Sequence, residues 1–188
     1  MLDSGSPHSR GPRTLNEGVS KEAPVTPSQD FPPYCWLMRR DVRQVDTPRP
    51  WPGNHRRVAF SPGIAPQLHA LLVNGYQQGG GSVPAYDAWR PSADTGPESD
   101  PSLWIITADD QGLTGAAHCW TSAFIRDLVV NPRARRQGLA LCLLSHAFYQ
   151  FHLRGEASVD LKVFESNHAA RLLYETSGMG YIQRTTAD

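Results

Sequence analysis

The sequence has few cysteines, and their spacing fits neither a disulfide framework nor a zinc site. Three cysteines, Cys35, Cys119 and Cys142, occur in 188 residues, and none belongs to a Cys-x-x-Cys pair. An odd number of widely spaced cysteines is typical of reduced thiols. The sequence also lacks a His-Glu-x-x-His motif, clustered metal ligands and the Ser/His/Asp order of a hydrolase, so we expect no metal site.

Long apolar runs and an excess of one charge are lacking too. No apolar stretch approaches the roughly 20 residues that span a bilayer, and the first residues contain no apolar block of the secretory kind. Eighteen basic and 18 acidic residues give a formal net charge of zero, which does not favour nucleic acid as a partner. We therefore expect a cytoplasmic protein with no membrane and no nucleic-acid partner.

The first thirty residues are poor in apolar side chains and rich in Ser, Pro, Gly and charge. Such a segment cannot bury enough surface to offset the entropy lost on ordering. We expect residues 1–30 to be a disordered tail. The remaining residues, 31–188, are numerous enough for one domain with a substantial core.

The rest of the sequence alternates between strand-like and helix-like patterns. Strand patterns cover 36–45, 103–108, 113–120, 123–130, 158–164 and 181–185, with a short candidate at 57–60. Helical spacing of apolar residues runs from 64 to the glycines at 79–81, from 140 to 151 and from 167 to 177. Residues 82–101, with several prolines, are expected to form a mobile loop with at most one helical turn. The order predicts a mixed α/β fold, with antiparallel strands over 103–130 and a right-handed crossover that makes 123–130 and 158–164 parallel.

The most informative segment joins the end of a predicted strand to the start of a helix. Leu128-Val129-Val130 is followed by the arginine-rich run Asn131-Pro132-Arg133-Ala134-Arg135-Arg136-Gln137-Gly138-Leu139-Ala140. Backbone N–H groups at a helix N-terminus have no intrahelical partner, and the helix dipole adds partial positive charge there. Gly138 lets a ligand approach the backbone closely. The segment therefore predicts a turn that binds phosphates.

Residues 102–182 resemble the GCN5-related N-acetyltransferase (GNAT) superfamily. Arg135-x-x-Gly138-x-Ala140 is similar to the family's pyrophosphate motif, and Asn167-x-x-Ala170-x-x-x-Tyr174-x-x-x-Gly178 follows it in the family's order. The resemblance implies a central mixed sheet flanked by helices, with splayed parallel strands that hold acetyl-coenzyme A. Because one short strand alone follows helix 167–177, the family's last strand is either missing or supplied by a partner chain, as in a homodimer.

The resemblance also implies a role for each matching residue. Backbone N–H groups of 136–140 would hold the pyrophosphate, with Arg133 or Arg136 neutralising its charge, and the pantetheine arm would pair with strand residues 128–130. The implied cofactor-binding residues are Leu128, Val129, Val130, Arg135, Arg136, Gln137, Gly138, Leu139, Ala140, Asn167, Ala170 and Tyr174. Asn167 also suits a helix N-cap. Tyr174 resembles the general acid that protonates the departing thiolate, although a tyrosine on an amphipathic helix can also serve packing alone.

The general base is not identified by any motif. The attacking amine must lose a proton, and Asp127 is the one carboxylate of strand 123–130. Asp127 is our catalytic candidate for this step, with pairing to Arg126 as the structural alternative and His118 as a second candidate base. Strict strand alternation would place Phe124, Arg126 and Leu128 on one face and Ile125, Asp127 and Val129 on the other.

We therefore expect an acetyl-CoA-dependent N-acetyltransferase that acetylates a primary amine of a small molecule by direct attack in a ternary complex. A protein N-terminus or a lysine side chain is the alternative acceptor, and a wide groove beside strand 123–130 would favour it. An alternative of a different class is a regulatory module that binds coenzyme A without catalysis. Product formation across a panel of amines distinguishes the enzyme from the module.

Overall fold

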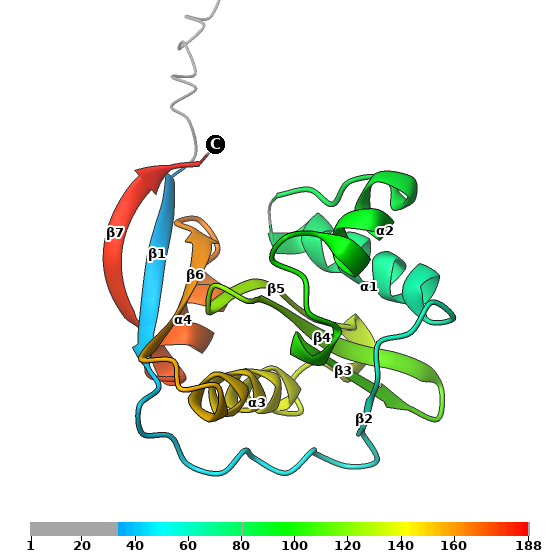
Figure 1. The fold of residues 1–188 in the computed structure, drawn as a ribbon, viewed down its shortest axis with the longest axis horizontal. Coiled ribbons are helices and arrows are strands. Elements are labelled where there is room, and N and C mark those ends of the chain that lie inside the picture. The colour runs from blue at the N-terminus through cyan, green and yellow to red at the C-terminus, as the bar shows by residue number, and fades with distance from the viewer. Residues whose placement is uncertain (1–33, 80, 188) are drawn as a thin grey trace, which may run out of the picture. The chain divides into compact units, whose positions relative to one another are not determined.

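A computed structural model describes residues 34–79 and 81–187, which lie in one compact unit, Pro32–Asp188. The predicted tail, residues 1–30, lies outside the described residues. In the described part, seven strands form one mixed sheet in the order β2-β3-β4-β5-β6-β1-β7, and four α-helices flank it (Figure 1). The strands are β1 (Tyr34–Asp41), β2 (Arg56–Val58), β3 (Trp104–Asp109), β4 (Gly112–Trp120), β5 (Phe124–Val130), β6 (Ser158–Phe164) and β7 (Gly180–Thr186). The helices are α1 (Ala65–Gly79), α2 (Tyr86–Thr95), α3 (Leu139–Leu153) and α4 (His168–Thr176).

The predicted order of strands and helices is confirmed, with one exception at 82–101. That segment contains α2, a ten-residue helix with Pro91 in its interior, so the prediction of a loop was wrong. An interior proline costs a helix about 3 kcal/mol. Trp89 of α2 is buried against Trp104 and α1, and burying on the order of 200 Å² of its surface contributes about 5 kcal/mol. The burial of Trp89 therefore outweighs the tendency of the proline to disrupt the helix.

The sheet is completed by the chain's own N-terminal strand. β1 lies between β6 and β7 and pairs antiparallel with both strands. Cys35 lies opposite Phe164 of β6, and Arg39 lies opposite Gly180 of β7. One strand, β7, follows α4 as expected, and the place next to β6 is taken by β1 of the same chain and not by a strand of a partner chain. The side chain of Met38 is fully buried in the core that packs beneath α3, which holds β1 in this position.

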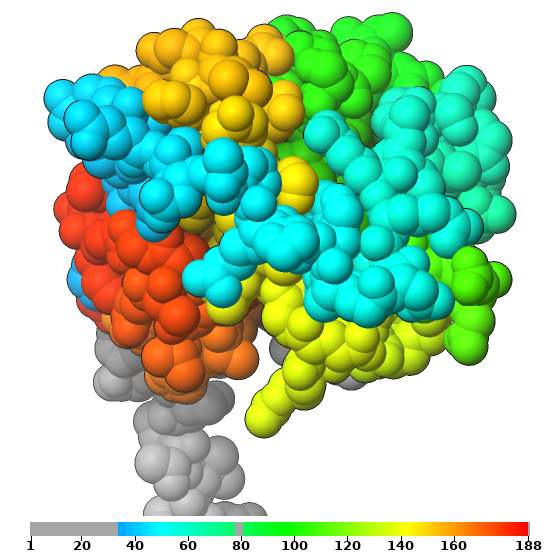
Figure 2. Space-filling model, turned by 90° about the horizontal axis from the view of Figure 1, so that it is seen from below, coloured from blue at the N-terminus to red at the C-terminus, as the bar shows by residue number. Residues whose placement is uncertain are grey.

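The segment between β1 and β2 lies across α3 and is tied to it. The Arg49 N–H donates to Ser145 Oγ at 3.1 Å, and the ring of Trp51 stacks on that of His146 with centroids 4.0 Å apart. Figure 2 shows this segment, in cyan, passing over the yellow residues of α3. The contacts hold this segment against α3, which packs on the face of the sheet opposite α1.

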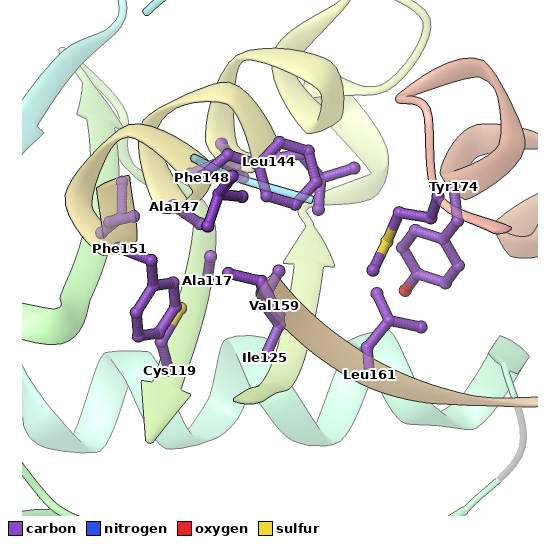
Figure 3. Close-up of a cluster of buried hydrophobic side chains, with 14 of the residues drawn as sticks. Ala117, Cys119, Ile125, Leu144, Ala147, Phe148, Phe151, Val159, Leu161 and Tyr174 are labelled. Carbon is purple, nitrogen blue, oxygen red and sulfur yellow. The ribbon is translucent and has the colours of Figure 1, made fainter. Parts of the chain in front are cut away.

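The core has two layers, one on each face of the sheet. On one face, α3 buries an apolar stripe at the helical spacing i, i+1, i+4, i+5 and i+8 against β4, β5 and β6 (Figure 3). The stripe consists of Leu143, Leu144, Ala147, Phe148 and Phe151. On the other face, α1 and α2 cover β3 and β4 through a second cluster that includes Leu68, Leu72 and Ile106. None of the described helices is long and apolar enough to cross a membrane.

Candidate functional site

The two parallel strands in the middle of the sheet separate after a short contact. β5 and β6 pair at Phe124–Asp160 and Ile125–Leu161, and a cavity of about 710 Å³ opens beyond those pairs. Its walls are formed by β5, β6, α1, α4 and the ends of β1 and β7, with the lining residues Cys35, Gly75, Tyr76, Arg126, Leu128, Val129, Lys162, Val163, Phe164, Asn167, Ala170, Tyr174, Thr186 and Ala187. The β5 edge that faces the cavity is available to an extended ligand, which would bind as an added strand does.

The turn between β5 and α3 has the geometry of an anion site. Gly138, the N-cap of α3, has φ +81°, and Arg136 has φ +63°. No side chain caps α3, so the first N–H groups of the helix are left to a ligand or solvent. A Cβ added to Gly138 would have no atom within 4 Å, which leaves room for a phosphate against the backbone. These features fit the pyrophosphate that the sequence motif predicts.

Most of the predicted cofactor residues line either the cavity or an adjoining hollow of about 200 Å³ at the start of α3. Those that line the cavity are Leu128, Val129, Asn167, Ala170 and Tyr174, and those that line the hollow are Val130, Arg135, Arg136, Gly138, Leu139 and Ala140. Together they mark a path along β5 into the turn. Gln137 lines neither space, because its amide contacts His55 Nε2 at 3.3 Å and the Arg133 carbonyl oxygen at 3.5 Å.

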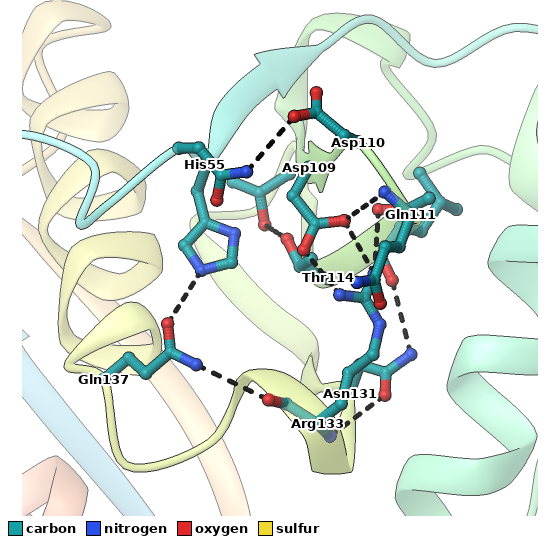
Figure 4. A network of polar contacts seen from close by, with 12 residues as sticks. His55, Asp109, Asp110, Gln111, Thr114, Asn131, Arg133 and Gln137 are labelled. Atoms are coloured by element: carbon teal, nitrogen blue, oxygen red, sulfur yellow. Dashed lines mark hydrogen bonds and ion pairs between the residues drawn. The ribbon is translucent and has the colours of Figure 1, made fainter.

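Arg133 is held away from the hollow by a polar network (Figure 4). Its guanidinium donates to both carboxylate oxygens of Asp109, with Nη2 2.8 Å from Oδ1, and this bidentate pair lowers the pKa of Asp109. Arg133 therefore fastens the turn to the β3–β4 hairpin. Of the two arginines that the sequence offered for phosphate charge, Arg136 is the one that lines the hollow.

Tyr174 lies in the wall of the cavity on α4. Its side chain is 8% exposed, and burial together with the charge of Asp127 raises the pKa of its phenol to about 12. The hydroxyl therefore keeps its proton at neutral pH, as an acid must. At the start of the same helix, Asn167 Oδ1 accepts from the Ala170 N–H at 3.1 Å, which confirms its capping role.

Asp127 does not line the cavity, and both of its carboxylate oxygens already accept hydrogen bonds. Tyr76 of α1 donates its hydroxyl proton to Oδ1, and His118 Nδ1 of β4 lies 3.1 Å from Oδ2. Arg126 Nε is further away, 3.5 Å from Oδ2. Pairing with Arg126 is therefore the weakest of the three contacts. No motif marks Tyr76 in the sequence, since it lies in a helix that was predicted from its apolar spacing alone.

A bulge at Arg126 breaks the alternation predicted for β5. The register passes from His118 opposite Asp127 to Cys119 opposite Ile125, so Arg126 has no partner position on β4. Ile125 consequently packs in the α3 core, as Leu128 does, whereas Val129 faces α1. The predicted division into two faces was therefore wrong on the N-terminal side of the bulge.

His118 lies inside the apolar layer between the sheet and α2. The residue is 4% exposed, and its ring stacks on Trp104 with centroids 3.8 Å apart and planes 4° from parallel. Among the described residues, Nε2 has no hydrogen-bond partner, so the polar contact of this ring is the one to Asp127. The same residues contain no group of three His, Cys, Asp or Glu side chains that could hold a metal ion.

Comparisons with known proteins agree with this geometry. The sequence model of the acetyltransferase (GNAT) family matches residues 67–181. A GCN5-related N-acetyltransferase from Sphaerobacter thermophilus has a similar structure, with a TM-score of 0.67 and 26% identity over 82% of this chain and 50% of that one. A comparison with curated proteins found no match.

Two further solved structures share the fold at lower identity. A diaminobutyrate acetyltransferase from Paenibacillus lautus, in complex with L-2,4-diaminobutyric acid and coenzyme A, is 16% identical over 65% of this chain and 73% of that one, with a TM-score of 0.54. A spermidine N-acetyltransferase from Vibrio cholerae, in complex with coenzyme A and spermine, is 19% identical over 66% and 80%, with a TM-score of 0.51. The chain thus spans half the length of the Sphaerobacter protein and most of the length of these two.

Proposed function

Because this chain belongs to the acetyltransferase (GNAT) family, we propose that it transfers an acetyl group from acetyl-CoA to a primary amine of a small molecule. The observation that carries the proposal is the cavity between β5 and β6, with Tyr174 in its wall and the uncapped start of α3 beside it. A ligand with a polyanionic end and an extended arm fits both spaces, with its anionic end at the start of α3 and its arm in the cavity. An isolated phosphate site would not require the separation of the strands.

In this proposal the donor lies along the path marked by β5. The turn from Arg136 to Ala140 binds the pyrophosphate through backbone N–H groups, and the Arg136 guanidinium balances its charge. The pantetheine arm hydrogen-bonds to the free edge of β5 at residues 128–130. The acetyl thioester then lies in the cavity beside Tyr174.

The transfer requires a proton donor and a proton acceptor on opposite sides of the thioester. The amine nitrogen bonds to the acetyl carbon, the carbon–sulfur bond breaks, and Tyr174 gives its phenolic proton to the sulfur. Asp127 is the final acceptor of the proton that the amine loses. Tyr174 of α4 lines the cavity directly, whereas Asp127 of β5 is connected to it through Tyr76, which lines the cavity.

The size of the cavity supports a small acceptor. Its volume of about 710 Å³ lies within the range of pockets that bind small molecules, and the thioester arm takes up part of it. The structures from Paenibacillus and Vibrio, which contain a diamine acid and a polyamine, show that this fold admits such acceptors in other members. A peptide would need an open groove beside β5, where α1 instead contributes Gly75 and Tyr76.

The proposal is tested by offering acetyl-CoA together with a panel of small amines, amino acids and short peptides, and following acetylated product by mass spectrometry. We expect product with a small amine. Product with peptides alone would move the acceptor to a protein N-terminus or lysine. Tight binding of acetyl-CoA without any product across the panel would instead identify a regulatory module that binds coenzyme A.

A further inference from the structure

Three polar side chains form a continuous chain from the cavity into the core. Tyr76 lines the cavity, its hydroxyl donates to Asp127, and Asp127 accepts from His118, whose ring stacks on Trp104. The three residues come from three elements, α1, β5 and β4. Asp127 and His118 are 6% and 4% exposed, so this chain of contacts meets the cavity at Tyr76.

A carboxylate in such a position is costly unless it is paired and hydrogen-bonded. The surrounding layer between the sheet and the helices α1 and α2 is otherwise apolar, formed by residues such as Leu72, Trp89 and Ile106. Packing alone would be satisfied by an apolar side chain at position 127. A buried acid that accepts a hydrogen bond from a hydroxyl in the cavity wall can take up a proton delivered through that hydroxyl.

We propose that Tyr76 is the catalytic residue that contacts the acceptor amine and relays its proton to Asp127. The inference rests on the proposed acetyltransferase function. A direct transfer from the amine to Asp127 would need a carboxylate oxygen at the cavity surface, whereas Asp127 does not line the cavity and its Oδ1 accepts from Tyr76, which does. The hydroxyl of Tyr76 stands where an incoming amine would otherwise meet the acid.

The relay is balanced in atoms and charge. As the nitrogen–carbon bond forms, an N–H proton passes from the amine to Tyr76 Oη, and the phenolic proton of Tyr76 passes to Asp127 Oδ1. Tyr76 is therefore neutral before and after the step, and Asp127 ends protonated. On the other side, the sulfur takes its proton from Tyr174 as the carbon–sulfur bond breaks. After release of the products, Asp127 returns its proton to solvent through Tyr76, and Tyr174 is reprotonated.

Two features of the structure suit Tyr76 to this role. Burial and the neighbouring charge of Asp127 raise the pKa of the Tyr76 phenol, so it carries a proton to pass on at every working pH. His118 acts as a positioning residue, because its Nδ1 fixes Oδ2 of Asp127 and leaves Oδ1 directed at Tyr76. The stack on Trp104 in turn fixes the imidazole ring.

A double-mutant cycle tests the relay. Single-turnover rates are measured with saturating acetyl-CoA and the best amine of the panel for wild type, Tyr76→Phe, Asp127→Asn and the double variant. We expect each single variant to lose about 100-fold in rate, and the double variant to lose no more than either, because both remove the same step. Tyr149→Phe on α3, which also deletes one phenolic hydroxyl, should keep the wild-type rate.

The alternatives give different results. If Asp127 accepts the proton directly, Tyr76→Phe frees Oδ1 and keeps or raises the rate, which overturns the relay even if Asp127→Asn fails to fold. If the chain of contacts serves stability alone, Tyr76→Phe lowers the melting temperature but keeps the rate, which also overturns it. Wild type that acetylates no amine refutes the proposed function, and the relay with it. Wild type that acetylates amines at a rate independent of Tyr76 refutes the relay alone.

Discussion

Replacement of Gly138 offers a quantitative test of the phosphate site. Its φ of +81° strains any other residue by about 1–2 kcal/mol, and no atom lies within 4 Å of a Cβ built there. Gly138→Ala should therefore cost stability but leave the hollow open. Gly138→Trp adds an indole that fills most of the hollow of about 200 Å³ and excludes the pyrophosphate.

The magnitude follows from mass action. Acetyl-CoA at 100 times its dissociation constant should raise the free energy of unfolding of wild type by about 2.7 kcal/mol. A variant that binds 100-fold more weakly gains only about 0.4 kcal/mol at the same concentration. We expect Gly138→Trp to fall to this level or below, and Gly138→Ala to retain most of the wild-type gain.

Denaturant unfolding with and without acetyl-CoA measures these gains. Gly155 provides a matched control at the opposite end of α3, since it has φ +79° and likewise no atom within 4 Å of a built Cβ. Gly155→Trp should suffer similar backbone strain and keep the full ligand effect. An unchanged gain in Gly138→Trp, or an equal loss in Gly155→Trp, would refute the assignment of the turn as the phosphate site.

Three further outcomes are expected. Tyr174→Phe should lower the single-turnover rate by about 100-fold or more at unchanged acetyl-CoA affinity. Because the pKa of Tyr174 is raised to about 12, this loss should be the same from pH 6 to 9, and equal rates for the two proteins would assign Tyr174 to packing. Phe151→Ala, at a fully buried position under the sheet, should cost about 3–5 kcal/mol in denaturant unfolding, and a loss below 1 kcal/mol would contradict the packing of α3. Removal of residues 1–30 should preserve a cooperative thermal transition, whereas removal of 1–41, which deletes β1, should abolish it.

Local patterns predicted the elements that make up the donor site. The apolar spacing of α3, the strand ending at Val130 and the asparagine cap of α4 all depend on residues within a few positions of one another. Their order along the chain then placed the phosphate turn beside the parallel strands, because a strand-helix-strand crossover leaves little choice of topology. The turn and the strands that we propose to bind the donor could for this reason be predicted before the structure.

The acceptor side depends on contacts between distant residues. Tyr76 and Asp127 are 51 positions apart, and no periodicity in α1 distinguishes this tyrosine from one that only packs. The bulge at Arg126 shifts the faces of β5 and is visible only in the pairing with β4. A carboxylate could be identified as a candidate base from the sequence, but its hydrogen-bond partners could not.

The position of β1 shows how such a distant pairing also shapes the site. Cys35 of β1 pairs with Phe164 of β6, and both side chains line the cavity together with Lys162. The strand that completes the sheet therefore supplies part of the cavity wall as well. Since the N-terminal strand pairs with residues more than 115 positions away, its loss would open the cavity and expose the edge of β6 at once. Removal of β1 should for this reason abolish both the stable fold and the binding of the acceptor amine. Gly138→Trp should instead weaken the binding of acetyl-CoA alone.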